Sequence, residues 1–295
     1  MAGAEMNGIL LIDKPAGWTS MDVCAKLRGA LHEKRIGHSG TLDPMATGLL
    51  VVFLGRATRA VEFAEADEKT YEAGLRLGVT TDTQDVTGAI LREAPVRVTE
   101  EELTAALERF TGELEQIPPM YSAVKVNGQK LYQLARKGRE VERQPRRITV
   151  FSMERIGSAE NGDILLRIRC SKGTYIRTLC HDIGAVLGCG GAMSALRRTH
   201  AGAFGISEAH TLDAVLAAAE HGEAEALLLP VDRLFSGKPV LTLTAGQEKA
   251  VRNGAGYTCA SAPGDYRLYD KGGGFLALGR VSEGTMRPIK SFFEV

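Results

Sequence analysis

A loop rich in glycine and proline, followed at once by an apolar run, constrains this chain more than any other segment. It reads G-H-S-G-T-L-D-P-M-A-T-G-L-L from Gly37 to Leu50, and the apolar run extends to Leu54. Its glycines permit tight turns, and Pro44 keeps Asp43 out of helical geometry. The pattern predicts an irregular loop that presents Asp43 beside a buried strand, as functional side chains often are. Taken alone, an aspartate before proline is more often a turn or cap residue.

The composition is that of an ordinary globular protein, with 44% hydrophobic and 24% charged residues among 295. This length suits one large domain and one small one. No run of eighteen apolar residues and no basic-then-apolar leader occurs, so we expect no membrane partner and no export. Five cysteines, an odd number without a C-x-x-C pair, argue against a disulfide framework or a zinc site. They suit the reducing cytoplasm.

Charge is segregated within a chain whose formal net charge is zero. The segment from Tyr121 to Arg147 holds eight Lys or Arg and two Glu, a net +6, so the remainder is −6. Tyr121 and Tyr132 stand among these cations. An exposed basic hairpin is often only a solvated surface, but this density with interleaved tyrosines is also typical of nucleic-acid contact.

Strands and helices are predicted through the first 230 residues. Strands are expected at 8–13, 49–54, 69–77, 89–92, 147–156 and 163–170, with 195–199 returning to the sheet. Helices are expected after Thr19 and Thr99, which begin capping boxes, after Thr174, and at 57–66, 131–137 and 212–220. The basic segment should contain a hairpin turning at Asn127-Gly128. Beyond a linker at 236–239, short apolar runs spaced by glycine-rich turns indicate a small β-barrel-like domain.

Two weaker motifs carry little weight. His181-Asp182 looks like a metal-binding pair, but no second His/Asp cluster supports it. The glycine-rich loop at Gly188–Gly191 lacks the strand and the G-K-S/T ending of a phosphate-binding loop. We therefore expect no metal and no nucleotide cofactor.

Five segments together resemble the bacterial tRNA pseudouridine-55 synthase family, known as TruB. They are, in order, L-I-D-K-P-x-G-x-T-S (11–20), G-H-x-G-T-L-D-P-x-A-T-G-x-L (37–50), K-x-Y (69–71), P-P-x-Y-S-A-x-K-V-x-G-x-x-x-Y-x-x-A-R (118–136) and G-T-Y-I-R (173–177). L-R-R-T at 196–199 also agrees, and the tail is similar to a PUA-type RNA-binding domain. The match covers about the first 230 residues, and its long motifs are very specific.

The resemblance implies an α+β fold with a mixed, mainly antiparallel central sheet flanked by helices, the pseudouridine synthase fold. It implies a catalytic domain at 1–236, with an RNA-gripping insertion at about 118–147, and a small PUA-like β-barrel domain at 238–295. The implied reaction breaks the bond between N1 of a T-loop uracil and C1′ of its ribose, rotates the base and rejoins it to C1′ through C5, which loses its proton while N1 gains one. It needs no cofactor or metal. The implied partner is the T-arm of tRNA, bound by a monomeric cytoplasmic enzyme.

The resemblance also assigns site residues. Asp43 matches the essential aspartate, which acts on the ring or the sugar as nucleophile or base. It must be ionised, and Arg177 matches the arginine that pairs with it. Tyr71 matches the stacking tyrosine and is also a candidate for removing the C5 proton from the flipped base. The implied substrate-binding residues are His38, Lys69, Asp85, Tyr175, Leu196, Lys125, Lys130, Arg136, Lys137 and Arg139.

Two other functions compete with this enzyme. An RNA-binding module or tRNA-folding chaperone would use the same basic surface without chemistry, but it would gain nothing from an ionised carboxylate beside phosphates. A metal-dependent phosphohydrolase built on His181-Asp182 would require a divalent metal. Because Asp43, Tyr71 and Arg177 are all intact, the sequence favours the enzyme.

Overall fold

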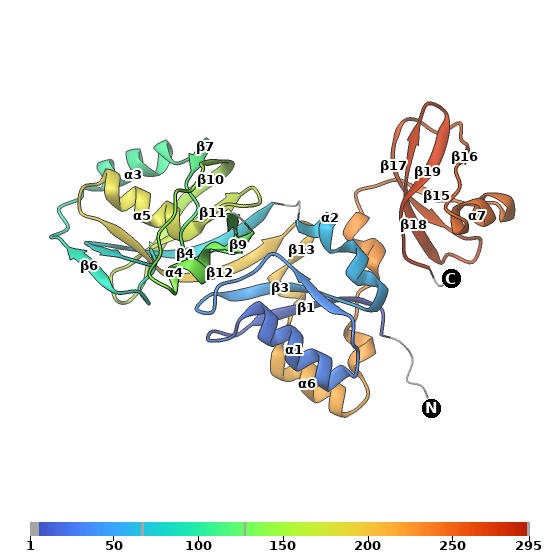
Figure 1. Cartoon of the computed structure of the whole chain (residues 1–295), viewed down its shortest axis with the longest axis horizontal. Helices are drawn as coiled ribbons and strands as arrows, with labels where there is room; N and C mark the ends of the chain where they lie inside the picture. The colour runs from blue at the N-terminus through green and yellow to red at the C-terminus, as the bar shows by residue number, and fades with distance from the viewer. Residues whose placement is uncertain (1–5, 66–67, 127, 294–295) are drawn as a thin grey trace. The chain divides into compact units, whose positions relative to one another are not determined.

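The computed structural model describes residues 6–65, 68–126 and 128–293 (Figure 1). The chain divides into two compact units. The first consists of Met1–Pro44, Leu49–Ala66 and Gly202–Val295, and the second of Met45–Gly48 and Asp67–Ala201. The chain therefore passes from the first unit to the second directly after Asp43-Pro44.

The first unit begins with a small layer of strands covered by helices. Its strands are β1 (Gly8–Lys14), β2 (Ile36–Ser39), most of β3 (Thr47–Leu54), β13 (Phe204–Gly205) and β14 (His210–Thr211). Its helices are α1 (Ser20–Leu31), α2 (Val61–Glu65), α6 (Leu212–Glu220) and the 3-10 turns η1 (Gly55–Ala60), η2 (Ile206–Glu208), η3 (Ala224–Leu227) and η4 (Val231–Phe235). Figure 1 shows α1 and α6 side by side next to β1 and β3. Apolar residues of α1 and α6 join those of β1 and β3 in one core cluster.

The local signals of this unit act as predicted, with two differences. The capping box of Thr19 and Asp22 is present at the start of α1. The helix expected at 57–66 is instead a 3-10 turn, η1, that continues into α2, and its last residue, Ala66, lies outside the described residues. Residues 36–39, expected to open the loop, form β2, because they can pair with β3 in antiparallel register.

The C-terminal part of the first unit is a five-stranded sheet. Its order is β15-β17-β18-β19-β16, with bounds β15 (Val240–Thr242), β16 (Tyr257–Thr258), β17 (Gly264–Tyr269), β18 (Phe275–Ser282) and β19 (Thr285–Ser291). A small core of its own includes Leu243, Leu268 and Met286. Helix α7 (Ala245–Arg252) was missed by the sequence analysis, although Thr244-x-x-Gln247 forms a capping box at its start.

The second unit is a sheet with helices and an insertion. Its strands are β4 (Lys69–Leu77), β7 (Gly112–Gln116), β10 (Arg146–Ser158), β11 (Ile164–Cys170) and β12 (Gly191–Ala201), with the small hairpins β5 (Val79–Thr81) to β6 (Ile90–Glu93) and β8 (Lys125–Val126) to β9 (Gln129–Lys130). Its helices are α3 (Glu100–Arg109), α4 (Leu131–Ala135) and α5 (Ile176–Val186). The order β12-β4-β11-β10-β7 is antiparallel throughout. The turn residue Asn127 lies outside the described residues.

Gly48 allows β3 and β12 to approach closely. Thr47 and Gly48 pair in parallel with Arg197 and Arg198 of β12. A Cβ atom on Gly48 would lie 2.3 Å from the carbonyl oxygen of Arg198, and the φ of Gly48 is +95°. Only glycine fits both conditions. Gly48, the last glycine of the motif at 37–50, is therefore required by strand pairing.

The α+β class and the mixed, mainly antiparallel sheet are confirmed. The predicted cap of α5 is wrong: Tyr175 is the N-cap residue and makes no side-chain cap hydrogen bond, while the Thr174 hydroxyl donates to the carbonyl of Ser171. Thr174 precedes the N-cap position by one residue, so its hydroxyl bonds to a carbonyl of the preceding turn instead of to an amide of the helix. Among the described residues, no helix is long and apolar enough to cross a membrane.

Candidate active site

Asp43 lies on a loop in which the residues on both sides of it, Leu42 and Pro44, are held by hydrogen bonds. On one side, the Leu42 amide donates to the Ser20 hydroxyl at 2.9 Å, and that hydroxyl donates to the Leu42 carbonyl at 3.3 Å. On the other side, the Pro44 carbonyl accepts a hydrogen bond of 2.8 Å from the Gly17 amide. Ser20 and Leu42 are buried, whereas Asp43 is partly exposed. The backbone on both sides of Asp43 is therefore fixed while its carboxylate reaches the surface.

Lys14 adds a buried cation beneath this loop. The side chain is fully buried, and Nζ donates to the carbonyl oxygens of Pro15 at 2.8 Å, Trp18 at 2.6 Å and Pro44 at 3.4 Å. A buried ammonium is stable only when its donors are used, and three carbonyls meet that need. Lys14 thereby ties the end of β1, the turn before α1 and the Asp43 loop together.

His38 lies on β2, opposite Val52 of β3, and is partly buried. The strand pairing fixes its backbone five residues before Asp43 within the same unit. Its role toward the substrate stays a prediction.

In the second unit, β4 and β12 bring predicted site residues to one face of the sheet. Tyr71 is opposite Arg198, and Ala73 is opposite Leu196. Since residues two apart on a strand share a face, Lys69, Tyr71 and Leu196 belong to the same face. Tyr71 is partly exposed, as a stacking residue must be, while Leu196 is 8% and Lys69 is 7% exposed. This burial leaves Lys69 little surface for RNA.

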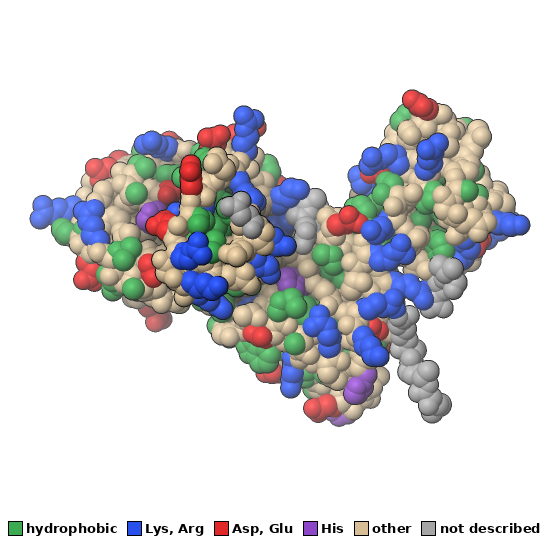
Figure 2. All heavy atoms as spheres, in the orientation of Figure 1, with side chains coloured by type: hydrophobic (Ala, Val, Ile, Leu, Met, Phe, Trp, Pro, Cys, Tyr) green, Lys and Arg blue, Asp and Glu red, His purple; other side chains and the backbone are tan. Residues whose placement is uncertain are grey.

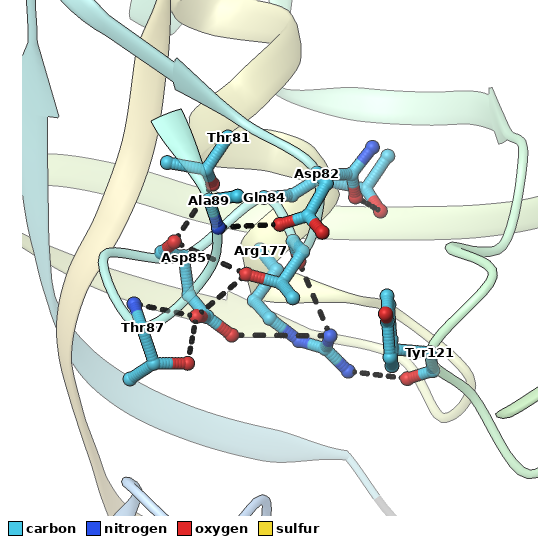
Figure 3. A network of polar contacts seen from close by, with 10 residues as sticks. Thr81, Asp82, Gln84, Asp85, Thr87, Ala89, Tyr121 and Arg177 are labelled. Carbon is cyan, nitrogen blue, oxygen red and sulfur yellow. Dashed lines mark hydrogen bonds and ion pairs between the residues drawn. The ribbon is translucent and has the colours of Figure 1, made fainter. Parts of the chain in front are cut away.

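Arg177 lies in the first turn of α5 and is held by three groups from two loops (Figure 3). Nη1 donates to the Thr83 carbonyl at 3.3 Å and Nη2 to the Tyr121 carbonyl at 2.8 Å. Nη1 is also 3.9 Å from Oδ2 of Asp85. The planar fork of arginine suits several fixed acceptors at once. The guanidinium is therefore set in one orientation inside the second unit.

Asp85 is itself tightly bound by its own turn. Its Oδ1 accepts hydrogen bonds from the Thr87 amide at 2.9 Å, the Thr87 hydroxyl at 2.5 Å and the Thr83 hydroxyl at 2.9 Å. Its backbone carbonyl accepts from the Thr81 hydroxyl at 2.7 Å. With 5% of its surface exposed, Asp85 faces Arg177, and its expected contact with the target nucleotide stays a prediction.

The predicted site residues are divided between the two units. Asp43 and His38 belong to the first unit, and Tyr71, Asp85, Tyr175, Arg177 and Leu196 to the second. The ion pair expected between Asp43 and Arg177 stays a prediction. Tyr175 is the partly exposed N-cap residue of α5, two residues before Arg177, and its role in the substrate pocket stays a prediction.

The basic segment folds as a hairpin and a short helix. Leu131 and Leu134 are buried and anchor α4. The ring of Tyr132 lies 5.6 Å from Lys130 Nζ and 5.4 Å from the Arg136 guanidinium carbon. Of the predicted RNA-binding cations in the segment, Lys125, Arg136, Lys137 and Arg139 are exposed and Lys130 is half-buried. Figure 2 shows Lys and Arg side chains gathered over the region where Figure 1 places α4 and β9. Cations around an aromatic ring form a surface suited to phosphates and bases.

The His181-Asp182 pair singled out in the sequence lies on α5. Burial raises the pKa of Asp182, an effect that the neighbouring His181 partly offsets. Among residues 6–65, 68–126 and 128–293, no three His, Cys, Asp or Glu side chains are placed to hold a metal ion.

Sequence reasoning missed residues that support Arg177. Thr83 and Thr87 were not singled out as site residues, and Tyr121 acts through its backbone carbonyl, which no side-chain pattern reveals. Gln116 was also missed, although a signal was present. In the strand G-E-L-E-Q the glutamates alternate with inward positions, which places Gln116 on the buried side.

Comparisons with known proteins agree on one family. The model for the "TruB family pseudouridylate synthase (N terminal domain)" matches residues 28–176, and the model for the "tRNA pseudouridylate synthase B C-terminal domain" matches residues 177–236. A tRNA pseudouridine synthase B of Azoarcus sp. (strain BH72) is 46% identical over 285 residues, covering 96% of this chain and 94% of the relative. The Clostridium kluyveri protein of the same name is 40% identical over 296 residues, covering 97% and 100%.

Solved structures share the fold. The protein in a structure of an H/ACA RNP bound to a substrate RNA containing 2'-deoxyuridine superposes with a TM-score of 0.74 at 25% identity, covering 98% of this chain and 86% of that one. A chain of a Cbf5-Nop10-Gar1 complex superposes with a TM-score of 0.75 at 26% identity, covering 98% and 85%. The predicted pseudouridine synthase fold, with a C-terminal PUA-like sheet, is confirmed.

Proposed function

Because this chain belongs to the TruB family of pseudouridylate synthases, we propose that it isomerises uridine 55 in the T-loop of tRNA to pseudouridine. The relatives are named for action on tRNA and cover nearly the whole chain, which supports the substrate class. The T-loop and position 55 are proposed because the motifs at 37–50 and 118–136 resemble those of the tRNA pseudouridine-55 synthase family.

The observation that carries this proposal is the double anchoring of the Asp43 loop. A turn aspartate needs only its own side-chain contacts, but here Ser20 fixes the residue before Asp43 and Lys14 fixes the residue after it. Burying the Lys14 ammonium to hold this loop is energetically unfavourable in itself. It is explained if the Asp43 carboxylate must be placed accurately against a reacting atom. Asp43 then serves as nucleophile or base toward the flipped uridine.

The remaining roles follow from where the side chains lie. Tyr71, partly exposed on β4, stacks on the flipped base, and Tyr175 and Leu196 form walls of its pocket. Arg177 pairs with Asp43 and keeps it ionised, while Asp85 holds the guanidinium in place. His38 orders the neighbouring bases. Lys69 is too buried for more than a small contact with the RNA.

The insertion at about 118–147 supplies the grip on RNA. Its exposed cations neutralise T-arm phosphates, and Tyr132 offers an aromatic surface beside Lys130 and Arg136. We propose that residues 1–236 with this insertion form the catalytic domain and that residues 238–295 add a PUA-like RNA-binding domain. A monomer in the cytoplasm is the expected acting form.

The experiment is tritium release from C5-tritiated uridine in a T-arm stem-loop, in buffer with EDTA. Wild type, Asp43→Asn and the control Asp213→Asn are compared, because Asp213 is an exposed aspartate of the same unit. The proposal expects release by wild type and by the control but none by Asp43→Asn. If wild type binds the RNA and releases no tritium, the chain is a binding module or folding chaperone.

A further inference from the structure

Gln116, the last residue of β7, forms a reciprocal pair with the backbone of Tyr175. Its Nε2 donates to the Tyr175 carbonyl at 3.0 Å, and its Oε1 accepts from the Tyr175 amide at 2.8 Å. The side chain is 3% exposed, and the two residues are 59 positions apart. A buried carboxamide with both ends satisfied by one backbone unit fixes that unit as a strand partner would.

This pair is placed where α5 begins. Tyr175 is the N-cap of α5, and neither its own side chain nor that of Thr174 caps the helix. Helix starts leave amides that need partners, and they fray when none is supplied. Gln116 accepts from the amide of the N-cap residue, as the N3 side chain of a capping box does, and so fixes the backbone at the start of the turn that carries Arg177.

The same short segment contacts the start of α5 a second time, at the side chain of Arg177. Five residues after Gln116, the Tyr121 carbonyl accepts a hydrogen bond of 2.8 Å from Nη2 of Arg177. Between the two contacts stand Pro118 and Pro119, both buried, whose fixed φ angles stiffen the segment. Residues 116–121 thus bracket the first turn of α5, at its backbone and at its guanidinium.

Gln116 also marks the base of the RNA-binding insertion. In the ladder of β7 and β10 it is opposite Arg146, so the chain leaves for the insertion and returns from it at one cross-strand pair. Arg143, near the end of the insertion, donates from Nη1 to the Pro118 carbonyl at 3.3 Å. The start of α5 is therefore tied to the root of the segment that grips RNA.

We propose that Gln116 is a positioning residue for the isomerisation. It holds Tyr175 and Arg177 in a fixed relation to the root of the insertion, so that RNA bound by the insertion meets an arginine already in place. This inference rests on the proposed function. It predicts that loss of the Gln116 carboxamide slows the chemical step and leaves RNA affinity nearly intact.

The test compares Gln116→Met with Leu114→Ala. Methionine has a similar volume but neither donor nor acceptor for Tyr175. Leu114 lies on the same face of β7, opposite Ile148, and its truncation weakens the strand while leaving the Gln116 carboxamide in place. Single-turnover rates, RNA dissociation constants, thermal midpoints and amide hydrogen exchange of residues 171–179 are measured for both variants.

For Gln116→Met we expect a single-turnover rate about 10- to 100-fold lower, since a misplacement of about 1 Å can cost on the order of 100-fold. We expect an RNA dissociation constant within about threefold of wild type and faster exchange at the Tyr175 amide. Leu114→Ala should lose as much thermal stability, keep its rate within about threefold and leave exchange at Tyr175 unchanged.

Three outcomes would overturn the proposal. Equal rate losses in the two variants at equal loss of stability would reduce Gln116 to a structural residue. A loss of RNA affinity as large as the loss of rate would make it a binding residue. An unchanged rate of hydrogen exchange at the Tyr175 amide in Gln116→Met would show that Gln116 does not hold the backbone of Tyr175. An inactive wild type would instead refute the proposed function, and the exchange comparison separates that failure from the others.

Discussion

Nη1 of Arg177 lies 3.9 Å from Oδ2 of Asp85, and both side chains are more than nine-tenths buried. The other oxygen of Asp85 is occupied by Thr83 and Thr87, so the carboxylate has one orientation. A buried cation requires compensation, and here a rigid turn supplies it. The arginine expected to pair with Asp43 is thus positioned by its own unit.

Replacing either member of this pair should affect chemistry more than binding. Arg177→Ala should lower the single-turnover rate by more than about 100-fold, and Asp85→Asn by about 10- to 100-fold. The hydrogen bonds that Arg177 donates to carbonyls and that the Asp85 carboxylate accepts involve a charged group, and each such bond is worth about 1.5–3 kcal/mol. RNA affinity, measured by filter binding, should change less than about threefold. Asp82→Asn in the same turn is the control, since Asp82 is exposed. Equal losses of rate and affinity would argue against a pairing of Arg177 with Asp43.

Lys14→Met should unsettle the Asp43 loop. It leaves the carbonyls of Pro15, Trp18 and Pro44 without their buried donor, at a cost of about 2–4 kcal/mol in the free energy of unfolding. Urea denaturation gives this cost. Tritium release should fall by more than the unfolded fraction explains, because Asp43 loses its anchor. Lys26→Met, an exposed lysine on α1, should change neither quantity. A stable and fully active Lys14→Met protein would contradict the anchoring role.

The insertion should account for much of the salt dependence of RNA binding. Replacing Arg136, Lys137 and Arg139 together by alanine should weaken binding and lower the slope of log K against log salt by about 2, if each cation neutralises one phosphate. The matched control replaces Arg92, Arg97 and Arg109, three exposed arginines of the same unit outside the insertion. An unchanged slope in the insertion variant would remove this segment from the RNA interface.

Stability should depend on pH through Asp163. Burial opposes its ionisation, but hydrogen bonds from Arg76, Ser194 and Asn161 outweigh burial and lower the pKa of Asp163. Arg76 binds both carboxylate oxygens at 2.9 Å. Because the folded pKa is below the unfolded one, this contribution is present above about pH 4 and is lost as pH falls through the folded pKa. The difference in unfolding free energy between wild type and Asp163→Asn should therefore be larger at pH 7 than at pH 3. A difference that grows on acidification would contradict the sign.

Several elements could be read from local sequence because local interactions form them. The capping boxes at Thr19 and Thr99 and the strand at 69–77 lie where the sequence predicts them. At the start of α5, the amide of the N-cap residue Tyr175 is satisfied by Gln116. The sequence could not predict this contact, because it depends on how β7 packs beside the helix. Helix α7 could have been predicted from the capping box of Thr244 and Gln247. It was missed because only strands were expected in this part of the chain.

The sequence by itself determined the family, the α+β class and the candidate residues. This was possible because long motifs and helix caps consist of residues that are close together in the sequence. The tertiary structure decided what holds those residues. Ser20 and Lys14 anchor the Asp43 loop from 22 and 30 positions away, and Thr83 and Tyr121 reach Arg177 across 94 and 56 positions. Most of these contacts use backbone carbonyls, which every residue possesses. Only the folding of distant segments against one another decides which carbonyl meets which side chain.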